Sequence, residues 1–255
     1  MKKVLFLLSI VMILKVFPQG TAGDEAKFQY RYLIDMPSSG ILEKGYVSVS
    51  NDVMPFGVLI SKMEVGVFDG LCFGISYGGE NIIGTGNPKW FKLPGVNVRF
   101  KFFDEAIALP SITIGFDSQG KGVYLDSTNR YSIKSPGFFA SASKNYEVLG
   151  YLSLHGSVNY SLEHSDGDNF VNFMVGIEKT IGKRVSLLLE YDFAFNDNNT
   201  DYYGTGAGYC NLGVRWSLGD GLTLGLDLRD LFSNQKLNAG AADRAIKIEY
   251  IRGIF

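Results

Sequence analysis

Apolar and polar side chains alternate along most of the chain. In residues 96–102, valine and phenylalanine at even positions alternate with asparagine, arginine and lysine at odd positions. Successive side chains of a β-strand point to opposite faces, so this period of two predicts a strand whose faces meet different surroundings. Helical spacing is not sustained anywhere after the N-terminal segment. The pattern predicts about twelve strands, near residues 45–51, 56–68, 71–79, 95–103, 109–117, 137–146, 151–163, 170–180, 184–193, 208–218, 221–231 and 244–254.

The links between these predicted strands alternate in length. The short ones cover residues 69–70, 104–108, 147–150, 181–183 and 219–220. The longer ones cover residues 80–94, 118–136, 164–169, 194–207 and 232–243, and they are rich in Asn, Asp, Gly and Ser. Short turns at one rim and long loops at the other are typical of bacterial transmembrane barrels.

The fold class that we predict is all-β: a transmembrane, antiparallel, up-and-down β-barrel of about 12 strands, formed by residues 45–255. An exterior of Leu, Val, Ile and Phe tolerates hydrocarbon, and closure of the sheet gives each backbone N–H and C=O group a partner where water is absent. The competing architecture is a secreted soluble β-barrel that binds a ligand. That alternative would have to cover every apolar face with a second layer of protein.

The N-terminus has the features of a secretory signal. Lys2 and Lys3 precede an apolar run of about 11 residues, and small and turn-forming residues follow it. That run is shorter than the roughly 20 residues that a membrane-spanning helix needs. We therefore expect residues 1–22 to be a signal peptide, with cleavage after Ala22 or Gly23. Residues 23–44 are expected to be a periplasmic lead-in or an extra strand.

Charge and cysteine content exclude several classes of function. A net charge of −2 offers no basic surface for phosphate backbones, so we expect no nucleic-acid partner. The two cysteines cannot form a disulfide framework or a zinc site. Strand parity places Cys72 inside the barrel and Cys210 outside it, so both thiols are predicted to be free. The glycine-rich residues 203–208 open no helix, and we expect no cofactor and no specific metal.

The polar face of each strand is expected to line the lumen. Basic and acidic residues balance there and alternate between neighbouring strands, so we expect cross-strand ion pairs. Two interpretations remain open: a salt-bridged filling that nearly closes the barrel, and a narrow aqueous channel with weak ion preference. The predicted lumen-lining residues are Arg99, Lys101, His155, Ser157, Glu163, Glu178, Arg184, Glu190, Asp192, Arg215, Asp227, Arg229, Lys247 and Glu249.

One pair of residues suggests catalysis. His155 and Ser157 lie two positions apart on one strand face, which resembles the His-x-Ser arrangement of outer-membrane lipid hydrolases. In those enzymes the pair faces the bilayer, whereas strand parity here points His155 into the lumen. We therefore expect no enzymatic activity and keep an outer-membrane lipid hydrolase as a further alternative.

Taken together, these features resemble a Gram-negative outer-membrane β-barrel protein. The terminal aromatic Phe255 on the last strand resembles the signal by which the barrel-assembly machinery recognises its clients. Residues 33–40 (LIDMPSSG), with residues 45–47, resemble the start of barrels associated with exopolysaccharide export. The resemblance implies an outer-membrane location, lipid and the assembly machinery as partners, and a small solute or polysaccharide as possible cargo. The expected function is a small, porin-like channel or a structural, surface-exposed envelope protein.

Overall fold

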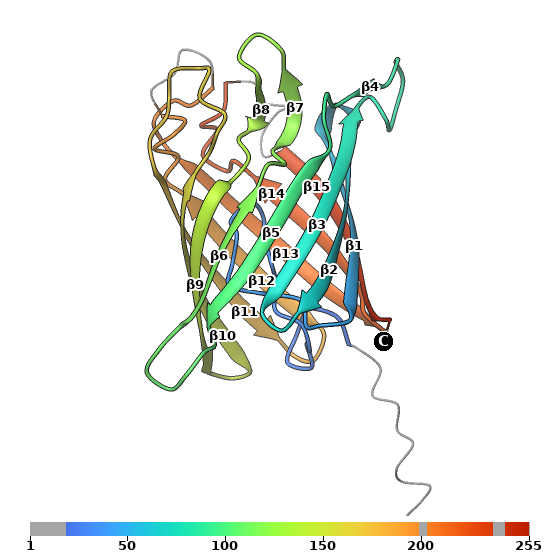
Figure 1. The fold of residues 1–255 in the computed structure, drawn as a ribbon, viewed down its shortest axis with the longest axis vertical. Helices are drawn as coiled ribbons and strands as arrows, with labels where there is room; N and C mark the ends of the chain where they lie inside the picture. Colours follow the sequence, from blue (N-terminus) through green and yellow to red (C-terminus); the bar gives the residue numbers. More distant parts are fainter. Residues whose placement is uncertain (1–18, 199–202, 237–242, 255) are drawn as a thin grey trace, which may run out of the picture.

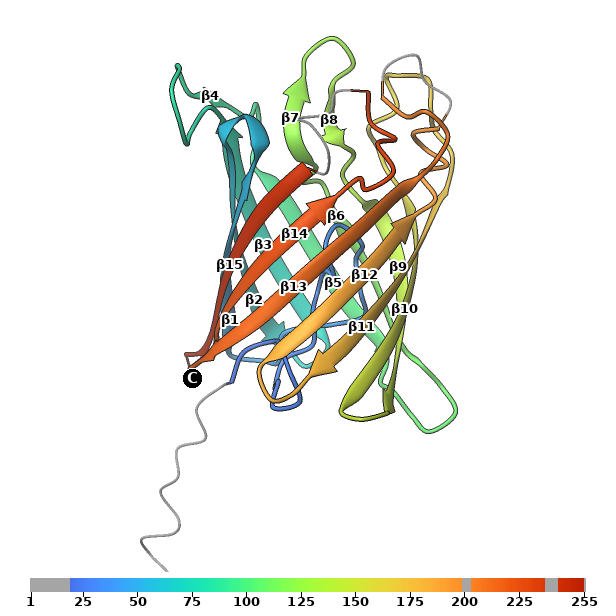
Figure 2. The same cartoon turned by 180° about the vertical axis from the view of Figure 1, so that it is seen from behind.

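The computed structural model describes residues 19–198, 203–236 and 243–254. Within these residues, twelve long antiparallel strands form one closed barrel (Figures 1 and 2). Each strand pairs with its neighbour in the chain, and the first pairs with the last. The barrel strands are β1 (Tyr46–Met54), β2 (Val58–Phe68), β3 (Leu71–Glu80), β5 (Gly95–Phe103), β6 (Ser111–Asp117), β9 (Gly137–Glu147), β10 (Tyr151–Tyr160), β11 (Asn172–Ile181), β12 (Val185–Asp192), β13 (Tyr209–Gly219), β14 (Leu222–Arg229) and β15 (Asp243–Gly253). The all-β, up-and-down barrel with 12 strands is confirmed.

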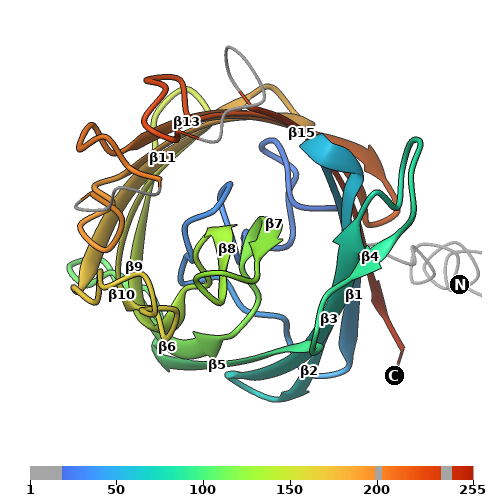
Figure 3. The same cartoon turned by 90° about the horizontal axis from the view of Figure 1, so that it is seen from above.

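The shorter elements lie at the rim with the long loops. The 3₁₀ turn η1 (Pro55–Gly57) joins β1 to β2, and β4 (Lys89–Trp90) extends the sheet beside the end of β3. β7 (Lys121–Leu125) and β8 (Arg130–Ile133) form a separate hairpin in the connection from β6 to β9. Seen from above, this hairpin lies within the ring of strands (Figure 3). The sequence predicted only a loop there.

The exterior of the barrel is apolar. On β11, Phe173, Val175 and Ile177 expose 48%, 47% and 41% of their surface, while the alternate residues Asn172 and Met174 are buried. The same alternation holds on the other long strands. These apolar side chains therefore form an outer coat and are not packed in a dry core, as the soluble alternative would require. No helix among the described residues is long and apolar enough to span a bilayer.

Residues 19–44, here called the inner segment, fold inside the barrel (Figure 3). They form no strand; their one bridge of β type joins Tyr32 to Pro37. Leu33, Met36 and Leu42 are fully buried between the segment and the wall. The sequence predicted a lead-in or an extra strand for this stretch and gave no indication that it enters the lumen. Most of the expected signal peptide, residues 1–18, lies outside the described residues, as does Phe255.

Candidate functional site: a polar chamber inside the barrel

The turn of the inner segment is held by one carboxylate of the wall. Glu190 on β12 is completely buried, and its oxygens accept hydrogen bonds from the backbone N–H groups of Ile34, Asp35 and Met36 at 2.9–3.1 Å. The side chain of Asn211 donates a further bond at 2.9 Å. A buried carboxylate needs such donors to offset the loss of water. The backbone N–H groups of the turn therefore bind the Glu190 carboxylate as an anion-binding nest does.

An arginine on the next strand supports the same turn. Arg215 on β13 forms an ion pair with Asp227 on β14, with 3.2 Å between Nη2 and Oδ2, and it donates a hydrogen bond to the carbonyl of Leu33 at 2.8 Å. Gly213 and Gly176 face the lumen nearby. A Cβ atom at Gly176 would lie 2.5 Å from the side chain of Leu33, so the missing side chain makes room for the segment.

Arg31 binds the segment to another part of the wall, around β1. Its Nε lies 2.7 Å from a carboxylate oxygen of Glu64 on β2, and its Nη2 contacts Ser48 at 2.8 Å. The same Nη2 pairs with Glu249 on β15. One guanidinium thus bridges two carboxylates from strands on either side of β1.

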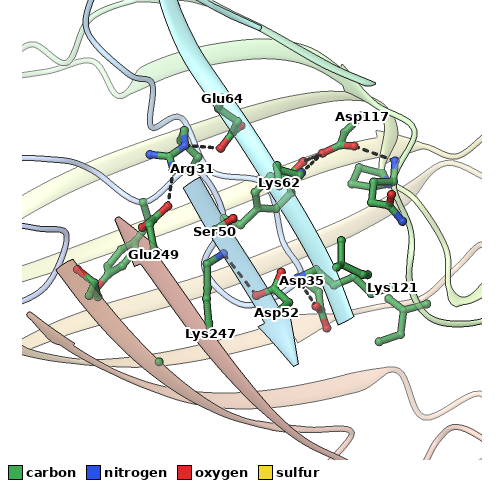
Figure 4. Close-up of a pocket in the computed structure, with 18 of the residues that line it drawn as sticks. Arg31, Asp35, Ser50, Asp52, Lys62, Glu64, Asp117, Lys121, Lys247 and Glu249 are labelled. Carbon is green, nitrogen blue, oxygen red and sulfur yellow. Dashed lines mark hydrogen bonds and ion pairs between the residues drawn. The ribbon is translucent and has the colours of Figure 1, made fainter. Parts of the chain in front are cut away.

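A polar chamber of about 40 Å³ lies between the inner segment, the wall and the β7–β8 connection (Figure 4). That volume has room for a few water molecules. Its charges come in facing pairs, among them Lys247 with Asp52 at 3.9 Å and Lys121 with Asp35 at 2.8 Å. The charged residues that line it are Arg31, Asp35, Asp52, Lys62, Glu64, Asp117, Lys121, Lys134, Arg215, Lys247 and Glu249.

The two inserts meet at this chamber. Lys121 on β7 donates hydrogen bonds to the carbonyl of Ile34 at 2.6 Å and to the carboxylate of Asp35. The ring of Tyr32 in the inner segment lies 4.6 Å from the Nζ atom of Lys62 and 4.4 Å from the guanidinium carbon of Arg99. The inner segment and the β7–β8 hairpin therefore act together to narrow the lumen.

A second ionic cluster connects the β7–β8 hairpin to the loop 161–171 and to the loop that follows β12. Arg130 on β8 pairs with Asp166 at 2.6 Å and with Asp197 at 2.8 Å, and Lys134 pairs with Asp166 at 2.8 Å. Burial raises the pKa of the Asp166 carboxyl, but the hydrogen bonds and charges of Lys134 and Arg130 outweigh it and leave that pKa below its ordinary value. Asp166 is therefore ionised at neutral pH.

Most of the predicted lumen-lining residues lie on inward positions of the wall. Seven of them are almost completely buried, namely Arg99, Ser157, Glu190, Arg215, Asp227, Arg229 and Glu249. Glu249 and Lys247 line the chamber, and Arg229 pairs with Asp35 at 3.2 Å. The remaining strand residues make local contacts: Lys101 with Asp104 at 3.6 Å, Glu178 with Ser186 at 2.9 Å, and Asp192 with Asn172 at 2.7 Å.

Two predicted residues lie elsewhere. Glu163 is above the end of β10, in the loop 161–171, where it accepts hydrogen bonds from the backbone N–H groups of Tyr131 and Ser135. Arg184 has the inward parity of β12 but precedes its first residue and is exposed in the turn 182–184. Strand parity gave the wrong surroundings for both because each lies just beyond a strand end.

The structure does not join His155 to Ser157. His155 Nδ1 lies 2.7 Å from the hydroxyl of Ser143, and the Ser157 hydroxyl lies 2.9 Å from that of Ser141, both on β9. Both predicted residues thus bond across to the neighbouring strand. Cys72 and Cys210 are unpaired, and no cluster of metal-binding side chains occurs in the described parts of the chain.

Several residues of the chamber were not found from the sequence. Lys62 and Glu64 on β2 have the inward parity of a strand that was predicted, so the period of two could have located them. Arg31, Asp35 and Lys121 could not be located in this way, because they lie in segments without a barrel strand. The inward glycines Gly176 and Gly213 are the clearest local sign that something fills the lumen.

Solved structures of outer-membrane proteins align with this chain. A KdgM porin in complex with disordered oligogalacturonate aligns with a TM-score of 0.50 and 10% identity over 80% of this chain and 98% of that chain. For the NanC porin the TM-score is 0.45, with 10% identity over 82% of this chain and 100% of that one. For Omp33 of Acinetobacter baumannii it is 0.45, with 8% identity over 84% and 99%. No family model and no curated protein matches the sequence.

The chain has the fold of an outer-membrane porin barrel. The likeness to the KdgM structure concerns the fold, and the apolar coat is suited to lipid, in agreement with the predicted outer-membrane location. The predicted resemblance is confirmed at the level of the fold.

Proposed function

We propose that this barrel is a channel for small hydrophilic solutes and that the inner segment is its plug. The observation that carries the proposal is the chemistry of the contact between plug and wall. Glu190, Arg215, Glu64 and Glu249 hold the segment by hydrogen bonds and ion pairs. Water can take over such contacts, which offsets part of the free energy needed to move the segment. The rest of that free energy goes into exposing the buried side chains of Leu33, Met36 and Leu42.

The wall has no need of the plug for its own closure. All twelve strands are paired with neighbours through backbone hydrogen bonds, and β1 with β15 completes the ring. Movement of the inner segment would therefore leave a continuous barrel around a polar lumen. A barrel of this size is wider than the 8-stranded type that side chains fill.

The balance of charge in the chamber supports weak ion selectivity. Basic and acidic side chains there are nearly equal in number and face one another in pairs. A carbohydrate chain is the cargo class to test first, since one structural neighbour was solved with oligogalacturonate. The resemblance of residues 33–40 to the start of polysaccharide-export barrels supports the same choice.

Planar-bilayer recording on the purified full chain tests this function. We expect discrete conductance steps with little preference between cations and anions, and uptake of oligosaccharides by liposomes that contain the protein. The competing candidate is a structural envelope protein whose salt-bridged lumen never opens. The absence of conductance at every voltage tried would favour the structural envelope protein and contradict the channel function. The lipid-hydrolase alternative has no support from the contacts of His155 and Ser157.

A further inference from the structure

A groove crosses the lipid-facing side of β9, β10 and β11. It is an open depression with a volume of about 600 Å³. Three small residues on two adjacent strands, Ala140, Ala142 and Gly156, form its floor together with Val158, because Ala142 lies opposite Gly156 and Ala140 lies opposite Val158. The apolar residues that flank the floor include Ile112, Phe173, Val175, Phe193 and Phe195. A second hollow of about 530 Å³ continues from Ala140 and Val158 towards β5 and β6.

Gly156 has no local structural reason to be a glycine. Its φ angle is not in the positive range, and a Cβ atom built on it would meet nothing within 4 Å. Glycine in a strand weakens the strand because it adds backbone freedom and contributes no packing. Gly176 differs, since the inner segment occupies the space beside it. The absence of a side chain at Gly156 deepens the groove at this point.

Two lysines lie on the lipid-facing side, between the groove and the rim with the short turns. In register, Lys144 on β9 is opposite Leu154 and Lys179 on β11 is opposite Leu152. Lys144 lies 3.1 Å from Glu105. The Nζ atom of Lys179 donates to the carbonyls of Leu149 and Thr180 at 2.8 Å, and within the described ranges it has no carboxylate partner. Cations on this face are costly in hydrocarbon and favourable at phosphate headgroups.

We propose that the groove binds one anionic glycerophospholipid of the periplasmic leaflet. Its phosphate lies between Lys144 and Lys179, and one acyl chain follows the floor formed by Ala142 and Gly156. From the row of Leu152 to the row of Val158, six residues at about 3.3 Å each cover ~20 Å of strand. With a strand tilt near 40° this corresponds to ~15 Å along the membrane normal, which is half of a hydrocarbon core of about 30 Å.

Charge favours a lipid over a second copy of the chain. A symmetric dimer in the membrane would place the same groove of both copies at the same depth. Lys144 is already paired with Glu105, but Lys179 of one copy would then lie at the same depth as Lys179 of the other without a carboxylate partner among the described residues. Like charges repel in a medium of low dielectric constant. A lipid phosphate instead supplies the counter-ion that Lys179 lacks.

Lipid retention by the purified full chain tests the proposal. After exchange into a mild detergent with added phosphatidylglycerol, native mass spectrometry is expected to show one bound phosphatidylglycerol per barrel and little bound phosphatidylcholine. Gly156→Leu should abolish this adduct because the new side chain fills the groove. Lys144→Gln and Lys179→Gln should each weaken binding by roughly fivefold, the effect of one cation near an anionic headgroup.

Matched variants on the far wall and at the rim serve as controls. Val49→Leu adds a methylene group to the lipid face of β1, and Lys183→Gln removes an exposed lysine, and neither should change lipid binding. Folding of each variant is checked by the mobility of unheated protein on gels. Equal phosphatidylglycerol retention by the wild type and Gly156→Leu would overturn the proposal. So would a wild-type dimer that Gly156→Leu converts to monomers, since a second copy would then occupy the groove.

Discussion

At the scale of single residues, the fit between inner segment and barrel depends on charges that the fold has removed from water. Glu190 is the clearest case, because one carboxylate serves three consecutive backbone N–H groups. A buried ion pair or charged hydrogen bond adds little net stability, but removal of one partner leaves the other unsatisfied. Changes at such residues should therefore loosen the segment more than they disturb the wall.

Glu190→Gln tests this statement. The amide keeps the shape of the side chain but puts an NH₂ group where an acceptor is needed, so we expect a loss of about 1–3 kcal/mol of the stability of the plugged state. Single-channel recording should show a larger open fraction than in the wild type. Glu147→Gln, on an exposed residue at the rim, is the matched control and should have no effect. If Glu190→Gln leaves the open fraction unchanged, the Glu190 carboxylate does not hold the segment in the plugged state.

The outer ionic cluster predicts a dependence on pH. The pKa of Asp166 is lower in the folded protein than its ordinary value of 3.8, because Lys134 and Arg130 outweigh the effect of burial. Its contribution to stability is therefore complete above the ordinary pKa and is lost as the pH falls through the lowered folded value. Hydrogen exchange of the β7–β8 amides, corrected for intrinsic rates, should accelerate below about pH 4. The Tyr131 amide is left out of this comparison, because burial raises the pKa of its acceptor Glu163.

Asp166→Asn supplies the control for that measurement. This variant lacks the carboxylate at every pH, so β7–β8 should exchange faster at neutral pH and should lose the acid-dependent component. If the variant and the wild type have the same exchange at pH 7, Asp166 does not fasten the hairpin.

The orientation of single side chains could in part be predicted from the sequence. Strand parity placed Arg99, Glu190, Arg215 and Asp227 on the inner face, because that property depends only on neighbours in the chain. It could not provide the backbone partners of Glu190 in the inner segment, which lie more than 150 residues away in the sequence. No local pattern records a contact of that range.

At the scale of elements, twelve strands could be predicted and two inserts could not. The strands have long apolar and polar alternations, since one face meets lipid and the other the lumen. The inner segment meets protein on nearly all sides, so its apolar residues follow no single period. The β7–β8 hairpin was not predicted, because its two short strands lie among turn-forming residues. Ile251 shows the same effect on β15, where an apolar side chain points inward to pack on Phe28 and Leu42.

Gly176→Val tests whether the inner segment fills the lumen. Added methyl groups would occupy the space of the Leu33 side chain and push the segment away from β11. We expect a greater open fraction and higher mean conductance, while the barrel itself still folds. Gly156→Val is the matched change on the outer face of β10, where the space is open, and it should leave conductance unaltered. Equal conductance in both variants would contradict the packing of the inner segment against Gly176 in the lumen.

At the scale of the whole molecule, the outer coat and the charged lumen describe a protein built for a membrane. We expect the protein to remain with outer membranes after washing with carbonate, and its mobility on gels to change on boiling, because the closed sheet resists detergent until heated. Release by carbonate would indicate a soluble barrel and contradict the membrane assignment. Within such a barrel, the inner segment is the part whose position decides whether solutes can pass.

A reversible disulfide on the inner segment tests directly whether this segment closes the channel. The thiol of Cys72 lies 3.0 Å from the backbone nitrogen of Leu42, and both residues belong to one buried cluster. Leu42→Cys therefore places a second thiol beside Cys72 for oxidation to a disulfide between segment and wall, with Cys210→Ser removing the other thiol. Loss of free thiol on oxidation checks that the bond has formed. In planar bilayers, we predict that the oxidised variant is silent and that reductant restores conductance steps like those of the wild type. Identical steps in the oxidised and reduced protein would contradict the claim that residues 19–44 close the channel.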